Sequence, residues 1–159
     1  MSKPTLPTLA ARVSRFCRSL RLDSRGNVLI ILGFAMIPMT FAAGFGVDYS
    51  RAMKLRTRMN AAADAAALAA VNVKMMQRTD ADATAAARTM FNSQVAGLQG
   101  MNYDPSTLAV DITSTGGVNA RRTVTVSYTA TSSNIFSGIL GAPTLPVNGS
   151  ATADATRAP

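Results

Sequence analysis

The chain has 159 residues, with 16 Lys and Arg against eight acidic residues, no His, no Trp and one Cys, and its formal net charge is +8. Without His, and with Cys17 as the only thiol, it cannot build a His/Cys metal site, a Ser-His or Cys-His catalytic pair or an internal disulfide. Apolar residues make up 48% of the chain, which is too many for a disordered tail. The composition favours an anchored or interaction-mediating protein over an enzyme, with no cofactor.

The positive charge flanks one uncharged stretch. Residues 1–25 carry a net charge of +5, residues 26–47 carry none, residues 48–78 carry +4 and residues 79–159 carry −1. A nucleic-acid-binding protein gathers its basic groups on a folded surface, whereas these groups bracket a hydrophobic segment. We therefore expect lipid rather than nucleic acid as a partner.

Residues 27–47, NVLIILGFAMIPMTFAAGFGV, predict a transmembrane helix with bounds 26–47. As an α-helix these 21 residues would extend about 31 Å, which matches the ~30 Å hydrocarbon core of a bilayer. Six basic residues precede the stretch and four follow it closely, so residues 1–25 are expected to be a basic cytoplasmic tail. At the membrane interfaces we expect Arg25, Asp48, Tyr49 and Arg51.

A cleaved export signal is the competing interpretation. The small residues Thr40 and Ala42 fit a cleavage site, and cleavage near Ala42 would release a secreted or periplasmic binding protein. Against it, a 25-residue basic leader is long for a signal peptide, and Pro38 lies inside the apolar run.

Residues 48–78 predict an Ala-rich helical stalk, because they contain no Pro or Gly and consist largely of helix-forming residues. Small and apolar residues recur there at spacings of three and four, which predicts a packing seam. The seam could pack on this chain's own head or on a neighbouring copy or partner helix, so self-association stays open. Its members are Ala52, Leu55, Met59, Ala62, Ala66, Ala69, Val73 and Met76.

Residues 79–159 predict a small α+β head. A second helix is expected from Asp80 or Asp82, as N-cap, to about Val95, and glycines end it. Three strands are expected at 107–113, 122–131 and 145–153, with a hairpin at 116–119, a helical turn at 133–140 and a bulge or turn at Asn148–Gly149. Apolar residues alternate with Thr and Ser, which indicates an antiparallel sheet with one wet face.

The region from Arg25 to Ala70 resembles the N-terminal domain of TadE/TadG-like proteins of the Flp (Tad) pilus-assembly system. The resemblance rests on an ordered set of features. These are Arg25-Gly26-Asn27-Val28 before the apolar run, Pro38 at its middle, Gly46-Val47-Asp48-Tyr49-Ser50-Arg51 at its end, and the segment RTRMNAAADAAALAA over residues 56–70.

The resemblance implies a single-pass protein of the bacterial inner membrane, with a cytoplasmic N-terminus and a periplasmic, pilin-like head. Its implied role is to build or anchor an adhesive pilus, as an assembly factor or minor-pilin-like protein, with pilus-assembly proteins or pilins as partners. Prepilins of this system are cut after a Gly and carry Glu five residues later. The matching cut would lie between Gly26 and Asn27, but the fifth residue is Ile31, which argues against a major pilin.

Overall fold

The computed structural model describes residues 25–116 and 120–157. The chain divides into two compact units, Met1–Ala43 and Gly44–Pro159, and each is described by itself. The longest element, helix α2 (Arg25–Ala70), contributes residues to both units.

The described part of the first unit is the N-terminal portion of α2. It contains Pro38, which lacks the N–H that a helix residue normally donates. The Thr40 hydroxyl donates a hydrogen bond to the Met36 carbonyl oxygen at 2.8 Å, so its hydrogen-bond donor is satisfied within its own helix.

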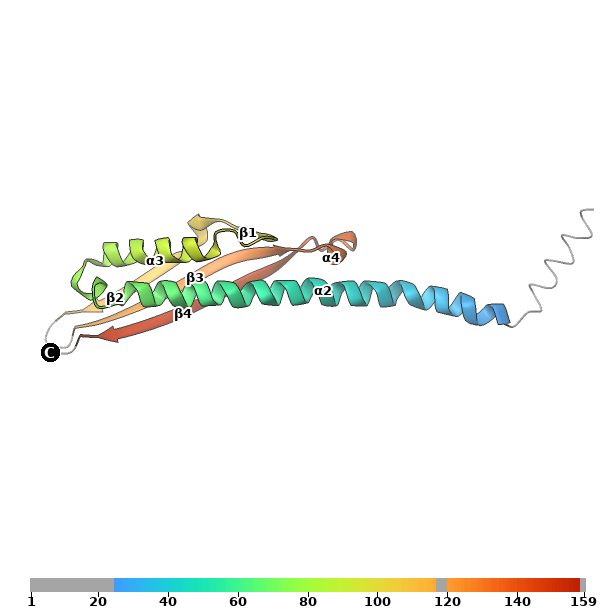
Figure 1. Cartoon of the computed structure of the whole chain (residues 1–159), viewed down its shortest axis with the longest axis horizontal. Helices are drawn as coiled ribbons and strands as arrows, with labels where there is room; N and C mark the ends of the chain where they lie inside the picture. The colour runs from blue at the N-terminus through green and yellow to red at the C-terminus, as the bar shows by residue number, and fades with distance from the viewer. Residues whose placement is uncertain (1–24, 117–119, 158–159) are drawn as a thin grey trace, which may run out of the picture. The chain divides into compact units, whose positions relative to one another are not determined.

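The second unit begins with the rest of α2 and continues as an α+β head (Figure 1). In chain order its other elements are the 3₁₀ turn η1 (Met75–Gln77), α3 (Asp80–Val95), β1 (Met101–Tyr103), the 3₁₀ turn η2 (Pro105–Thr107), β2 (Ala109–Thr115), β3 (Arg121–Ser133), α4 (Phe136–Ile139) and β4 (Thr144–Thr156).

Strand β3 is the centre of an antiparallel sheet that has four strands among the described residues. Strands β1 and β2 pair with successive parts of β3, and β4 pairs with β3 along its whole length. Val126 of β3, for example, lies opposite Val110 of β2 and Ala151 of β4.

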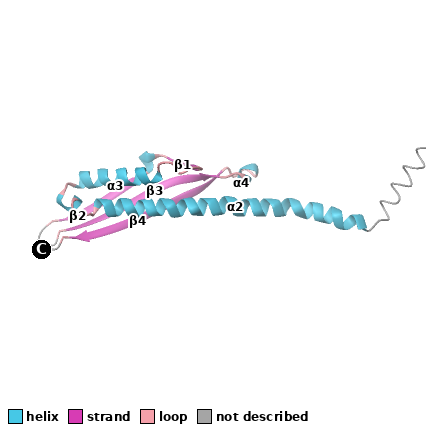
Figure 2. Cartoon of the chain, in the orientation of Figure 1, coloured by secondary structure: helices cyan, strands magenta, loops and turns pink. Residues whose placement is uncertain are grey.

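Both helices of the head cover the same face of the sheet, which gives two layers (Figure 2). The covered face carries the apolar residues of β3 that alternate with Thr and Ser, and the helices meet them largely with alanine, which lets backbones approach closely. From β3 the core takes Val124, Val126, Tyr128 and Ala130; from α2 Ala52, Met59, Ala62, Ala63, Ala66, Ala67 and Ala70; and from α3 Ala83, Ala87, Phe91 and Val95.

The α+β class, the long N-terminal helix, the second helix and the one-sided sheet agree with the sequence prediction, but the predicted number of strands was wrong. The missed strand, β1, has only three residues, which is too short for an alternating pattern to be recognised. The predicted bulge at Asn148–Gly149 was also wrong, because both residues pair regularly with Thr129 and Tyr128. Of the predicted 116–119 hairpin, residues 117–119 lie outside the described part of the chain.

Two helix boundaries differ from the prediction for side-chain reasons. The stalk helix ends at Ala70 rather than near residue 78. There the Asn72 amide donates to the Ala69 carbonyl at 2.7 Å and its oxygen accepts from the Met75 N–H at 2.9 Å, so its side chain competes with the helical bonds. The N-cap of α3 is Thr79, not an Asp, and Asp82 completes a capping box with it.

Candidate functional site

The N-terminal portion of α2 is the candidate membrane anchor. One helix among the described residues, Gly26–Ala70, is long and apolar enough to cross a membrane, with a mean hydropathy of 2.2 in its most apolar window. Its large apolar side chains from Val28 to Met39 are mostly solvent-exposed. A soluble core helix would bury such residues, so this surface is suited to lipid or to other apolar helices. The predicted processing residues Gly26 and Asn27 lie in the first turn of α2.

Asp48, which the sequence predicts to lie at the membrane interface, is buried within the head. Its side chain lies on α2 but accepts four hydrogen bonds from the loop between β3 and β4. The N–H groups of Ile135, Phe136 and Ser137 donate to it at 3.0, 2.9 and 2.7 Å, and the Ser137 hydroxyl donates at 2.9 Å. One carboxylate therefore supplies the first turn of α4 with the acceptors that its own backbone cannot provide.

These bonds set the pKa of Asp48 in a definite direction. The Ser137 N–H lowers the pKa most, desolvation opposes it, and the Ile135 N–H, the Ser137 hydroxyl and the Phe136 N–H lower it further. The result is a pKa below the ordinary value of 3.8. The carboxylate is thus held in its charged form by fixed donors, as a structural cap and not as an acid or base that exchanges protons near neutral pH.

Gly44, one helical turn before Asp48, faces the same loop. A Cβ atom built at Gly44 would lie 2.6 Å from Cδ1 and 2.7 Å from Cβ of Phe136, so the Phe136 side chain packs on bare backbone. Gly44 and Asp48 together form the junction between α2 and the α4 loop, which we define as residues 135–140. A residue larger than Gly would push the loop away from the helix.

The neighbours of Asp48 that were also predicted for the interface remain at the surface. Tyr49 and Arg51 are exposed on α2. Arg51 lines a cavity of about 330 Å³ together with Leu55 and residues of the 99–100 turn and of β3. Arg25 is the first residue of α2, and its side chain lies outside the described part of the structure.

The packing seam of the stalk faces the head's own sheet over most of its length. Ala52, Leu55, Met59, Ala62 and Ala66 are buried. The seam then diverges from the predicted residues, because Ala63, Ala67 and Ala70 are buried instead of Ala69, which is half-buried. Val73 is 79% exposed and Met76 is half-buried, and both follow the end of the α-helix.

A polar contact inside this seam explains why β4 carries a glycine. The Tyr128 hydroxyl of β3 donates a 2.6 Å hydrogen bond to the Asn60 side-chain oxygen of α2. Gly149 of β4 lies against both groups, and a Cβ built there would lie 2.6 Å from the Tyr128 hydroxyl oxygen and closer still to the Asn60 oxygen. The glycine thus allows close packing around a half-buried hydrogen bond and does not form a turn.

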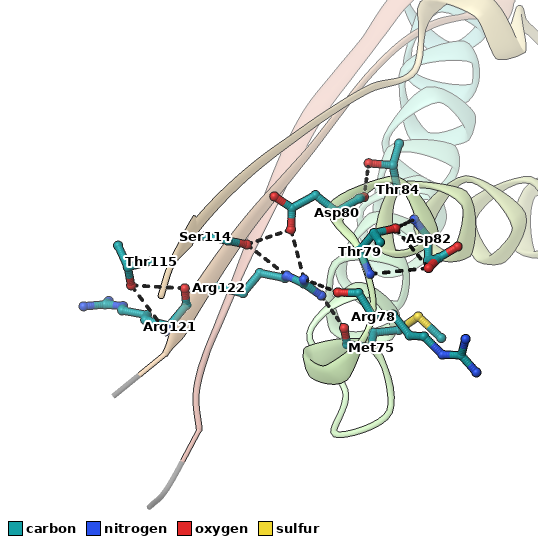
Figure 3. Close-up of polar contacts among 10 residues, drawn as sticks. All are labelled: Met75, Arg78, Thr79, Asp80, Asp82, Thr84, Ser114, Thr115, Arg121 and Arg122. Atoms are coloured by element: carbon teal, nitrogen blue, oxygen red, sulfur yellow. Dashed lines mark hydrogen bonds and ion pairs between the residues drawn. The ribbon is translucent and has the colours of Figure 1, made fainter. Parts of the chain in front are cut away.

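At the other end of the head, Arg122 fastens the segment between α2 and α3 to the sheet (Figure 3). Its guanidinium donates to the carbonyl oxygens of Met75 and Arg78, to the Asp80 carboxylate at 2.9 Å and to the Ser114 hydroxyl at 3.1 Å. Arg122 is only 6% exposed. A buried cation is costly unless it is hydrogen-bonded, and these acceptors satisfy the N–H groups of its guanidinium. It closes the end of the core beneath the 71–79 segment.

The sequence analysis missed the roles of Arg122, Asn60, Gly149 and the α4 loop. Arg122 had a signal, because it occupies the same alternating face of β3 as Val124 and Val126. The partner of Asp48 had none, since Ser137 is 89 positions away. Local periodicity carries no information on such a pairing.

The comparisons agree with the residues that suggested a family. Residues 26–87 match the model of the TadE/G-like Flp pilus-assembly family. Neither the curated proteins nor the solved structures gave a match. The matched segment contains the apolar stretch, the Gly44–Asp48 junction, the buried seam and the first half of α3. Residues 26–87 are therefore similar to the TadE/G-like Flp pilus-assembly family, the same family that the sequence features suggested.

Proposed function

We propose that the protein is a single-pass, membrane-anchored component of Flp/Tad pilus assembly that acts through contacts between helices and through its head, without enzymatic activity. The observation that carries the proposal is the family match over residues 26–87, which spans the exposed apolar helix and the elements that join it to the head. A pilus-assembly family implies pilus-assembly proteins or pilins as partners.

The anchor follows from the contrast between the two parts of α2. Side chains such as Leu29, Phe34 and Met39 are exposed, whereas from Ala52 to Ala70 one face is buried on the sheet. An exposed apolar helix needs lipid or neighbouring apolar helices, so it is the part that reaches the membrane and its partners. The basic tail of residues 1–25 supports a cytoplasmic N-terminus and a periplasmic head.

The burial of the seam also bears on where partners would bind. Leu55 and Met59 lie in the head's own core, so Asp substitutions there would unfold the head rather than report on a partner. Contacts with other chains are better sought on the exposed apolar face of residues 28–47. The burial of the seam supports the proposal that any self-association occurs along the exposed apolar helix and not along the stalk seam.

The test is co-isolation from the native host after cross-linking in the membrane. The full chain with a C-terminal affinity tag should enrich Flp/Tad pilus-assembly proteins or pilins. The matched control replaces residues 26–47 with an unrelated single-pass membrane segment, which preserves insertion and the head. We expect the control to remain in the membrane but to lose these partners.

Two results would contradict the proposal. The first is that the full chain enriches no pilus protein while cells lacking it still assemble normal pili. The second is that the chain leaves the membrane in carbonate, which would favour the alternative of a protein released by cleavage near Ala42. Such a cleavage would leave the compact unit that begins at Gly44 intact.

A further inference from the structure

The loop between β3 and β4 exposes apolar side chains that no other part of the head covers among the described residues. Ile135, Ile139 and Leu140 are 58%, 72% and 64% exposed, and Phe136 is 37% exposed. The sequence carries no charge from Thr123 to Ala153, so no charged side chain of this loop would have to be dehydrated on entering an apolar environment. Clustered exposed apolar residues of this kind usually mark a contact surface.

The junction with α2 fixes where this loop lies in the head. Asp48 holds the backbone of Ile135, Phe136 and Ser137 through its four hydrogen bonds, and the Phe136 ring packs on Gly44. The loop is therefore fastened to one turn of α2. Its apolar tip is fixed by a buried carboxylate rather than hanging freely from the sheet.

That turn of α2 is where the uncharged apolar stretch ends. Phe45 and Val47 lie between Gly44 and Asp48 in the chain, and both are about half exposed. The next residues, Tyr49 and Arg51, have the aromatic and cationic character that suits lipid headgroups. The loop is thus held at the level of the helix where hydrocarbon would give way to headgroups.

We propose that the α4 loop is a second membrane contact, in which Ile139 and Leu140 enter the outer interface of the bilayer that α2 spans. This inference rests on the proposed membrane anchoring. Lipid is favoured as the occupant because the loop is fastened to the end of the apolar stretch and is itself uncharged. The contact would restrict how far the head tilts relative to the membrane normal, because a single membrane-spanning helix does not by itself fix that angle.

The experiment uses the full chain with Cys17→Ser and one new cysteine at a time, labelled with an environment-sensitive fluorophore. The protein is reconstituted into vesicles of phosphatidylethanolamine and phosphatidylglycerol, with or without lipids that carry a nitroxide quencher. The test position is Ile139→Cys. Val73→Cys is the matched control, because Val73 is an equally exposed apolar residue beyond the far end of α2.

The label at Ile139 should lose most of its fluorescence when the quencher is placed near the headgroups, and the label at Val73 should be unaffected. A third variant, Ile31→Cys, reports on the anchor itself and should be quenched by a nitroxide deep in the acyl chains. Quenching at Ile31 without quenching at Ile139 would overturn the loop's role alone. Absence of quenching at Ile31 would overturn the proposed anchoring, and with it this inference.

Discussion

Asp48 and Ser137 are 89 positions apart and are joined by two hydrogen bonds, at 2.7 Å from the Ser137 N–H and 2.9 Å from its hydroxyl, both to one oxygen of Asp48. This pair connects the family-matched helix to a loop outside the matched residues. A buried carboxylate is stable only when hydrogen-bond donors surround it. Asp48, together with the N–H groups of residues 135–137 and the Ser137 hydroxyl, therefore forms a structural connection between α2 and the α4 loop, which we call the joint.

Replacing the joint's acceptor should loosen the α4 loop. In Asp48→Asn an amide N–H₂ group faces backbone donors, so at least one of the four bonds is lost. We expect the amides of Ile135 and Phe136 to exchange with solvent on the order of tenfold faster, by a local opening. Hydrogen exchange followed by mass spectrometry measures this. Asp111→Asn, at an exposed carboxylate, is the control, and equal rates in wild type and Asp48→Asn would argue against the joint.

The joint should also weaken in acid. The pKa of Asp48 is lowered in the folded head, chiefly by the Ser137 N–H, so its stabilisation is fully present above the ordinary value of about 3.8 and is lost as the pH falls through the lower folded pKa. Asp104, beside the Ser106 N–H, and Asp154, beside Arg121, also have lowered pKa values. The measurement is therefore the difference in stability between wild type and Asp48→Asn against pH. That difference should shrink below about pH 3.8, and a constant difference would contradict the account.

Removing the guanidinium group of Arg122 should destabilise the head. Arg122→Ala leaves the carbonyl oxygens of Met75 and Arg78 without this donor, and we expect the free energy of unfolding to fall by about 1.5–3 kcal/mol. Arg122→Lys should recover only part, because one ammonium cannot reach four acceptors at once. Denaturant titration measures both.

The neighbouring Arg121 provides the control for that prediction. Its ion pair with Asp154 is on the surface, where such pairs contribute little, so Arg121→Ala should change the unfolding midpoint only slightly. Equal effects at the two positions would mean that Arg122 does not fasten the 71–79 segment.

A methyl group at position 149 should disturb the packing between sheet and stalk. Gly149→Ala forces a Cβ onto the Asn60 and Tyr128 side chains, and we expect a loss of about 1–3 kcal/mol in the free energy of unfolding. Gly116→Ala is the control, since a Cβ there meets nothing within 4 Å. If thermal melts place the two variants together, the Tyr128–Asn60 contact is looser than described.

Local patterns were enough to predict most of the helices and strands but not the contacts between residues far apart in the chain. The alternation of Val124, Val126, Tyr128 and Ala130 revealed β3 and its buried face, and the uncharged stretch revealed the candidate membrane helix. These signals work because each depends only on neighbouring residues.

The parts that could not be predicted depend on residues far apart in the chain. The hydrogen bonds between Asp48 and Ser137 could not be predicted from the residues near Asp48. The turn predicted at Asn148–Gly149 was wrong because Gly149 packs against Asn60 and Tyr128. The early end of the stalk helix is a different case. It depends on Asn72, whose side chain competes with the hydrogen bonds of the helix backbone. Asn72 was a local signal for the helix end, but a helix propensity summed over the whole segment does not reveal it.

The most direct test of the central claim is the intact mass of the protein in the carbonate-resistant membrane fraction of its native host. The account predicts that the protein stays in this fraction with the apolar stretch retained, either unprocessed or cut after Gly26. The cut form would identify a candidate fibre subunit, and the unprocessed form an assembly factor. A soluble form that begins near Ala43 would contradict the anchor and favour the released binding protein.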